Sequence, residues 1–194
     1  MPKPFRHCRV LDEQLRKCVD DRTRATLLAG MDCVSESSRP EVKAAWVYEM
    51  MQRMDRLLDR STCIKVREGC ACVLSDEQSI YAKTFRKLRK LHPDDEEYIQ
   101  KVVAYLNGTA PLRRCGEVTR RGGEICSVIG RGICGCPVVR EGLSQPIWRT
   151  WCRCGKGSLL SVYRYVRLDR RCEMDIVRTV AGGADECVFV TRYV

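Results

Sequence analysis

The pattern of apolar residues and glycines changes at Gly108, and this change limits the folds that the chain can adopt. Before Gly108, apolar residues recur every three to four positions, which predicts amphipathic helices. After Gly108, glycines become frequent and short alternating segments replace the helical pattern, which predicts strands and turns. We therefore predict an α+β protein: a helical N-terminal half, residues 1–108, followed by a β-hairpin-rich, cysteine-rich α+β half, residues 109–194. We expect the two halves to pack as one unit.

The N-terminal half contains recognisable helix boundaries. One helix is predicted over residues 10–29, because Gly30 suits its end. The next has Ser38 as its expected cap, Pro40 in its first turn and a methionine-rich apolar face that runs to about residue 60. Further helices are predicted over 79–91 and from Pro93 to Gly108, where four acidic residues favour the helix start. Residues 109–114 read as a linker.

The C-terminal half is predicted to combine two strand pairs with one short helix. Residues 118–129 form a hairpin that turns at Gly122 and Gly123. A helix follows over 158–166, and two strands over 172–180 and 187–194 are joined by a glycine-containing turn.

Cysteine is the residue type that says most about function. The chain has 14 cysteines in 194 residues, and six of them form the Cys-x-Cys pairs Cys70/Cys72, Cys134/Cys136 and Cys152/Cys154. The start of the sequence has no apolar run typical of an export signal, and no stretch approaches the roughly 18 apolar residues that cross a membrane. We therefore predict a cytoplasmic protein without membrane association, in which clustered thiols serve as metal ligands or reactive groups.

The predicted topology brings several of these thiols to one place. If the strand over 172–180 returns across the helix at 158–166, its end lies near Cys152 and Cys154, and the turn that follows delivers Cys187 to the same end. Cys172 then lies roughly 26 Å away, at the usual rise of a strand. Cys134 and Cys136 are the natural further members of the group.

We therefore predict a thiolate metal site made by Cys134, Cys136, Cys152, Cys154 and Cys187. Four thiolates suit a structural zinc ion, or alternatively an iron–sulfur cluster, and a helix start would lower the pKa of thiols beside it. Trp148, Trp151 and Tyr163 are candidate walls of a ligand pocket. Other cysteines have different expected roles: Cys18, Cys126 and Cys172 suit core packing, and Cys33, Cys63, Cys70 and Cys72 could form a second cluster.

Two other classes of function stay open. A redox or hydrolytic enzyme could use Cys152 or Cys154, but His7 and His92 are the only histidines and no catalytic motif accompanies them. A formal net charge of +10 allows a single-stranded nucleic-acid binder, in which arginines alternate with aromatic residues. Its candidate residues are Arg149, Arg153, Arg164, Arg167, Arg170 and Arg171, with Trp148, Trp151, Tyr163 and Tyr165.

Two segments carry a resemblance to known families. Cys152-Arg-Cys-Gly-Lys-Gly157 before a short helix and a strand, then Gly182-Gly-Ala-Asp-Glu-Cys-Val-Phe189, resembles the 4-vinyl-reductase-type domains. That resemblance implies a small ligand-binding module with an apolar ligand and cysteines at one end. The whole chain is also similar to an uncharacterised group of cysteine-rich prokaryotic proteins, through Cys134-Gly-Cys-Pro137 and Trp151-Cys-Arg-Cys-Gly-Lys-Gly157.

The leading hypothesis is a protein that binds or senses a small molecule or a metal, with a thiolate metal site at one end of its pocket.

Overall fold

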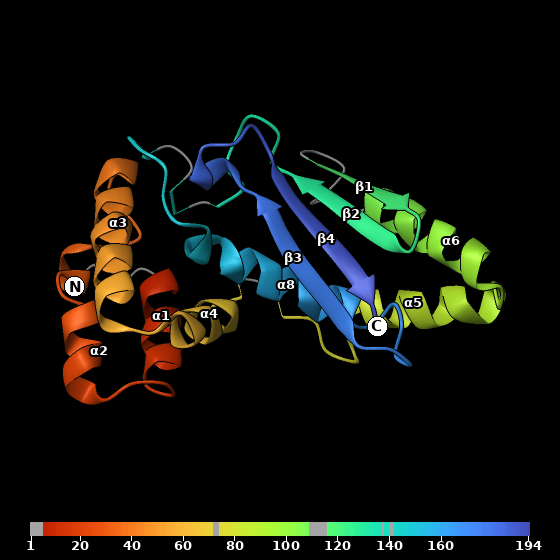
Figure 1. Cartoon of the computed structure of the whole chain (residues 1–194), viewed down its shortest axis with the longest axis horizontal. Helices are drawn as coiled ribbons and strands as arrows, with labels where there is room; N and C mark the ends of the chain where they lie inside the picture. Colours follow the sequence, from red (N-terminus) through yellow and green to blue (C-terminus); the bar gives the residue numbers. More distant parts are fainter. Residues whose placement is uncertain (1–5, 72–73, 109–115, 137, 140–141) are drawn as a thin grey trace.

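The N-terminal helices gather at one end of the molecule (Figure 1). The computed structural model describes residues 6–71, 74–108, 116–136, 138–139 and 142–194. Its first elements are α1 (Arg6–Leu15), α2 (Asp21–Leu27), a 3-10 helix η1 (Met31–Cys33), α3 (Pro40–Leu57) and α4 (Arg60–Gly69). Residues 109–114, predicted as a linker, lie outside the described residues, as do Cys72 and Pro137.

Two helix boundaries differ from the prediction because aspartate side chains cap the starts of additional helices. The single helix expected over 10–29 is wrong: the Asp20 carboxylate accepts a hydrogen bond from the Thr23 backbone N–H at 2.9 Å and starts α2. Asp59 likewise accepts from the backbone N–H groups of Ser61 and Thr62 and starts α4, which the prediction missed. An aspartate cap therefore starts a new helix inside a segment that apolar periodicity alone would predict as one continuous helix.

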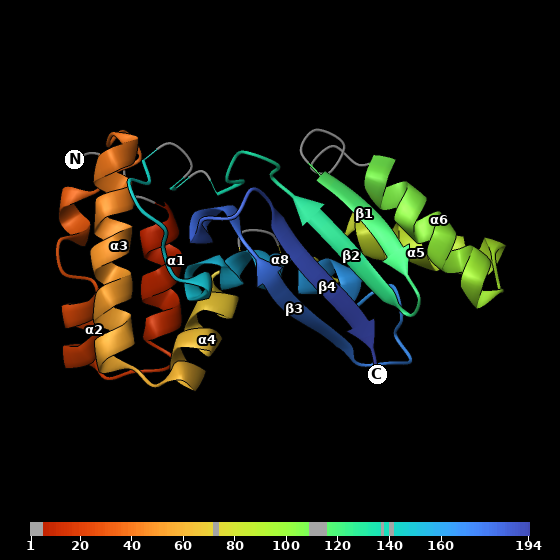
Figure 2. The same ribbon diagram turned by 45° about the horizontal axis from the view of Figure 1, so that its top comes forward.

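Helix α3 has the predicted Pro40 as its first residue and buries its methionine-rich face. Its N-cap is Arg39, not Ser38, whose hydroxyl accepts a hydrogen bond from the Ser35 backbone N–H. Helices α5 (Ile80–Leu91) and α6 (Asp95–Gly108) lie at the opposite end of the molecule (Figures 1 and 2). The Ser79 hydroxyl caps α5 by accepting from the Ala82 backbone N–H.

A four-stranded antiparallel sheet occupies the middle of the molecule. Its strands are β1 (Gly116–Arg121), β2 (Glu124–Ile129), β3 (Cys172–Arg178) and β4 (Cys187–Tyr193), in the order β1-β2-β4-β3. The β1–β2 turn falls at the predicted glycines, with Arg121 paired to Glu124. A 3-10 helix, η3 (Val180–Gly182), joins β3 to β4. These elements confirm the α+β class and the order of the two halves.

Helix α8 (Arg153–Tyr163) runs along the sheet and connects it to the N-terminal helices (Figure 2). It follows a 3-10 helix, η2 (Arg149–Cys152), and begins five residues before the predicted position at residue 158. Gly157 lies inside α8, where a Cβ atom would stand 2.4 Å from the Glu68 carbonyl oxygen. A glycine here lets α8 pack closely on α4.

Two hydrophobic cores result, and their boundary does not follow Gly108. The methionine core joins α1–α4 to the segment around residues 134–154; its buried members include Leu11, Leu15, Val47, Met50, Met51, Met54, Val66, Val139 and Trp151. The tyrosine core joins α5, α6, the C-terminal part of α8 and the sheet; its buried members include Phe85, Tyr98, Val102, Ile125, Tyr163, Met174 and Phe189.

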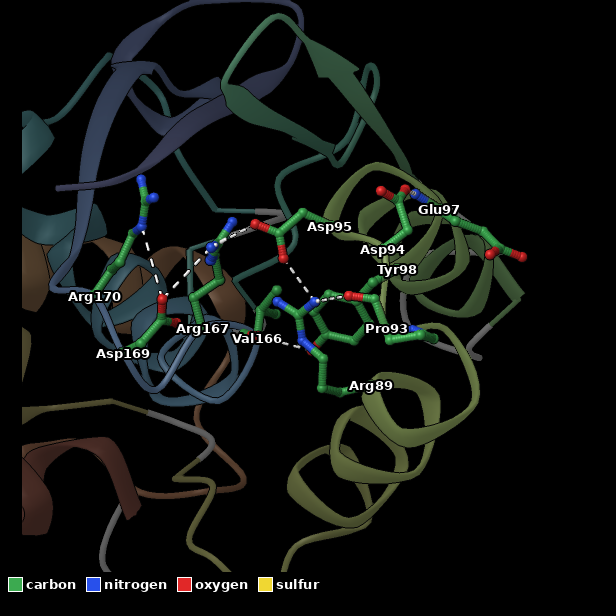
Figure 3. A network of polar contacts seen from close by, with 10 residues as sticks. All are labelled: Arg89, Pro93, Asp94, Asp95, Glu97, Tyr98, Val166, Arg167, Asp169 and Arg170. Atoms are coloured by element: carbon green, nitrogen blue, oxygen red, sulfur yellow. Dashed lines mark hydrogen bonds and ion pairs between the residues drawn. The ribbon is translucent and has the colours of Figure 1, made fainter.

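Ion pairs hold the α5–α6 corner against the segment that follows α8 (Figure 3). The Asp95 carboxylate accepts Arg89 at 2.6 Å and Arg167 at 2.8 Å. The same corner also contains a hydrogen bond from the Tyr98 hydroxyl to the Val166 carbonyl, at 2.7 Å. In the described part of the chain, no helix is both long and apolar enough to cross a membrane.

Candidate functional site

The five cysteines predicted to meet line one cavity of about 310 Å³. Cys152 and Cys154 stand at the start of α8, Cys187 is the first residue of β4, and Cys134 and Cys136 lie in the loop after β2. The other walls come from Ile129, Gly135, Trp151, Gly155, Ser158, Leu159 and Phe189. Cys172 lies at the opposite end of β3, paired with Tyr193, as the predicted strand geometry requires.

The loop that carries Cys134 is fixed by glycines and by one backbone contact. Gly130 has a φ of 69°, and a Cβ atom there would stand 2.5 Å from the Ile133 carbonyl oxygen. Gly132, with a φ of 70°, donates from its N–H to the Asp185 carbonyl at 2.6 Å. The loop is therefore tied to the turn before β4, which brings its two thiols towards Cys187.

The cavity lies at the seam between the two cores. Trp151, Cys134 and Cys154 belong to the methionine core, whereas Phe189 is a buried member of the tyrosine core and Ile129 and Leu159 pack against it. Ligand cavities form preferentially where two packing units meet, because neither unit alone fills the space between them.

Burial dominates the electrostatics of this cavity. It raises the pKa of the Cys152 thiol to about 12 and that of Cys136 to about 11, and it also raises the pKa values of Cys134 and Cys187. We expected the start of α8 to lower the pKa of nearby thiols. That expectation is wrong for Cys152, because the cost of placing a thiolate in this apolar space exceeds the attraction of the helix terminus.

Two of the thiols have ordinary backbone partners. The Cys154 thiol donates to the Trp151 carbonyl at 3.5 Å, and the Cys187 sulfur accepts from the Val180 backbone N–H at 3.3 Å. Neutral thiols held in this way behave as small, polarisable apolar groups.

The predicted cofactor, zinc or an iron–sulfur cluster, is wrong. Among the residues that the structure describes, no group of three or more His, Cys, Asp or Glu side chains is arranged to hold a metal ion. A zinc thiolate site needs four sulfurs converging at about 2.3 Å from one point. Here the five cysteines line a cavity of about 310 Å³, which is far larger than an ion.

The aromatic residues predicted as pocket walls are divided. Trp151 lines the cavity. Trp148 packs against Tyr48, with ring centroids 5.3 Å apart, and Tyr163 lies in the tyrosine core with its hydroxyl 2.6 Å from that of Ser127. Sequence reasoning missed Phe189, although it lies two positions after Cys187 on the same strand, and alternate residues of a strand share a face.

Among the described residues, Cys33, Cys63 and Cys70 do not come together as the second cluster that we considered, and Cys72 lies outside the described part of the chain. Cys33 is exposed, and the Cys63 thiol donates to the Met54 carbonyl at 3.6 Å. Cys70 is buried at the end of α4, where it lines a smaller cavity together with Cys154. Cys18 packs against the methionine core and Cys172 against the tyrosine core, in agreement with the packing prediction.

The arginines proposed for nucleic-acid binding are largely engaged within the protein. Arg153 pairs with Glu68 at 2.7 Å, Arg171 with Glu173 at 2.5 Å and Arg167 with Asp95. Trp151 and Tyr163 are buried, so neither ring is available for stacking on a base. The structure does not support this function.

The chain is an α+β protein with a thiol-lined cavity, and comparison with known families shows which family it belongs to. A family model matches residues 6–192. The chain belongs to this family, DUF6144, which is a family of unknown function. Among curated proteins, no sequence matches the chain.

Two solved structures of H-NOX domains from Shewanella oneidensis are distantly similar. The first, in the Fe(II)CO ligation state, has 14% sequence identity and a TM-score of 0.45 over 100% of this chain and 99% of that chain. The second, in the Fe(II)NO ligation state, has 13% identity and a TM-score of 0.42 over 98% and 99%. Similarity at this level assigns neither a fold nor a ligand to the present chain.

Proposed function

We propose that this protein binds a small, uncharged, largely apolar molecule in the thiol-lined cavity, and that it acts as a binding or sensing protein. One observation carries the proposal: a cavity of about 310 Å³ whose walls are thiols, aromatic rings and aliphatic side chains, with the Ser158 hydroxyl among them already donating to the Cys154 carbonyl. Its volume is at the lower end of the range for small-molecule sites.

The protonation state of the thiols supports this choice of ligand. Because burial raises the pKa of Cys134, Cys136, Cys152 and Cys187, these walls carry no charge at neutral pH. An uncharged apolar molecule loses little solvation energy on entering such a space and gains contact with polarisable sulfur. The resemblance to 4-vinyl-reductase-type domains implies the same ligand class and is part of the proposal.

The location supports sensing as the consequence of binding. The cavity is walled by both cores, so a ligand that fills it contacts α8, β4 and the Cys134 loop at once. Filling this space stabilises the arrangement of the two cores, and a protein that changes its stability or motion on binding can report the ligand to a partner.

Titration with Prodan, a neutral naphthalene fluorophore whose emission shifts to the blue in apolar surroundings, tests the proposal. We expect saturable binding to the full chain with one site. Gly155→Leu should weaken it at least tenfold, because a Cβ atom at this position makes an ordinary contact, 3.7 Å from Phe189 Cζ, and the rest of the side chain then occupies the cavity. The proposal fails if Prodan does not bind, or if Gly155→Leu binds it as tightly.

Gly123→Leu is the matched control. Gly123 lies in the β1–β2 turn, where an added Cβ atom meets nothing within 4 Å. It introduces the same side chain at an exposed site and should leave the Prodan affinity unchanged. Leu159→Phe narrows the cavity from another wall residue of α8 and gives a second test if Gly155→Leu does not fold.

A further inference from the structure

A second cavity, of about 50 Å³, lies where α1, the end of α4 and the start of α8 meet. Its lining includes Arg6, His7 and Val10 from α1, together with Arg67, Cys70 and Cys154. Three of these six residues carry nitrogen groups that are or can become cationic, and no carboxylate lines this cavity among the residues that the structure describes.

Arg67 is the unusual member of this lining. It is only 3% exposed, so its guanidinium group is removed from water. One Nη atom donates to the Trp151 carbonyl at 2.8 Å, and the guanidinium carbon lies 3.9 Å from the centroid of the Trp151 ring. The Nε atom is buried and has no hydrogen-bond acceptor in the described part of the chain.

Other buried or half-buried arginines in the protein are paired with a carboxylate, which Arg67 lacks among the described residues. Arg89 and Arg167 share the carboxylate of Asp95 (Figure 3). Glu68, the sequence neighbour of Arg67, instead accepts Arg153 at 2.7 Å and Lys156 at 2.8 Å. Among the described residues, Arg67 takes part in no ion pair.

The nearby thiol does not supply the missing negative charge. Arg67 lowers the pKa of Cys70, but burial is the larger effect and raises it overall, so the thiol is neutral at pH 7. Glu36 is exposed, and its carboxylate accepts the Arg6 backbone N–H at 2.8 Å. A buried guanidinium without an anion is expensive, and such groups are normally compensated.

We propose that this cavity binds a small anion, with Arg67 as its principal ligand. A guanidinium group presents a planar fork of N–H donors, which suits a carboxylate or a halide. The volume of about 50 Å³ admits an anion of the size of formate or chloride and excludes a sugar acid such as gluconate. Because Arg67 stacks on Trp151, the bound anion also fixes one wall of the thiol-lined cavity.

Thermal unfolding of the full chain tests this site. Sodium formate, sodium chloride or sodium phosphate replaces sodium gluconate at constant ionic strength, so that screening stays the same and anion size varies. We expect a saturable rise in Tm with formate or chloride, of about 4 °C at ten times Kd. The formate and chloride arms distinguish a carboxylate site from a halide site, and phosphate should have little effect because of its size.

Three variants decide whether Arg67 is responsible. Arg67→Met keeps the apolar stem, removes the charge and should lose the anion response. Arg60→Met, on the exposed first turn of the same helix, should keep it. Val10→Phe fills the cavity without changing Arg67 and should also lose the response, which keeps the test informative if Arg67→Met does not fold. The proposal is overturned if Tm is insensitive to formate and chloride, or if the same response persists in Arg67→Met or Val10→Phe.

Discussion

The two cores of this protein are built by different means. The tyrosine core buries hydroxyl groups that each have a defined partner: Tyr98 donates to Val166, Tyr163 pairs with Ser127, and the Tyr193 hydroxyl donates to the Tyr163 carbonyl at 3.0 Å. The methionine core relies on Met, Leu, Val and Cys side chains, which need no directional contacts. Directional hydrogen bonds specify one arrangement, whereas flexible thioethers adapt to several.

This difference explains where the cavity is found. The tyrosine core ends at Phe189 on β4, and the methionine core ends at Trp151 and Cys154 on α8. Between them lie small side chains and the Cys134 loop, which together do not fill the space. A site at such a seam can respond to a ligand without disturbing the core that holds the sheet together.

The largest expected effect is a difference between the two cores in how much stability each loses as the pH is raised. In the folded protein the pKa of Cys136 is about 11 and that of Cys152 is about 12, above the ordinary value of 9.0. The two protonated thiols therefore contribute fully to the free energy of unfolding below pH 9, and this contribution is lost as the pH rises towards 11–12. The loss is up to about 1.4 kcal/mol per pH unit for each thiol. Burial also raises the pKa of Cys172, which packs against the tyrosine core, to about 11, and it raises the pKa of Tyr98 from 10.0 to about 12. Because fewer thiols belong to the tyrosine core, we expect that core to lose less stability than the methionine core between about pH 9 and 10.

The chain itself provides both reporters for this titration. All three tryptophans, Trp46, Trp148 and Trp151, belong to the methionine core or pack against it, so tryptophan fluorescence reports that core. Six of the seven tyrosines belong to the tyrosine core or pack against it, and Tyr48 packs against the methionine core, so tyrosinate absorbance mainly reports the tyrosine core. The comparison is contradicted if tyrosinate appears before the fluorescence changes.

Two glycines in α8 give opposite predictions for the contact between the cores. Gly157→Ala places a Cβ atom 2.4 Å from the Glu68 carbonyl oxygen and should destabilise the protein by about 1–3 kcal/mol, because α4 and α8 must move apart. Gly155→Ala adds a methyl group at an ordinary distance from Phe189 and should stabilise the helix by about 0.5–1 kcal/mol. Urea denaturation of both variants measures the difference. Equal effects at the two positions would mean that α4 does not pack on α8 as described.

The hydroxyl pair in the tyrosine core should give a smaller effect than the difference between the two glycine variants. Tyr163→Phe removes the partner of the fully buried Ser127 hydroxyl and should cost about 1–2 kcal/mol of unfolding free energy. Adding Ser127→Ala should recover part of that loss, because no unpaired hydroxyl then remains. A strictly additive double-mutant cycle would show that the pair is not coupled.

Local sequence signals predicted much of this fold. Pro40 and Ser79 indicated the starts of α3 and α5, and Gly122 and Gly123 indicated the β1–β2 turn. The strand and helix order also placed Cys152, Cys154 and Cys187 at one end of the sheet. These features depend on backbone preferences and on chain connectivity, both of which are written in short stretches of sequence.

Tertiary structure decided the chemistry of the site. Whether a thiol at a helix start is a thiolate depends on how much water reaches it, and burial by residues from distant segments raised the pKa of Cys152 instead of lowering it. The surroundings of Arg67 were also decided by packing. Glu68 is its neighbour in the sequence, but in the folded protein the Glu68 carboxylate forms ion pairs with Arg153 and Lys156. Local propensity and chain order were enough to predict most of the elements, apart from the division of α1 from α2 and the presence of α4, and to predict which cysteines meet. Only the packed structure determined that the thiols surround a cavity and that a cation is buried beside them, because desolvation is a property of the whole environment.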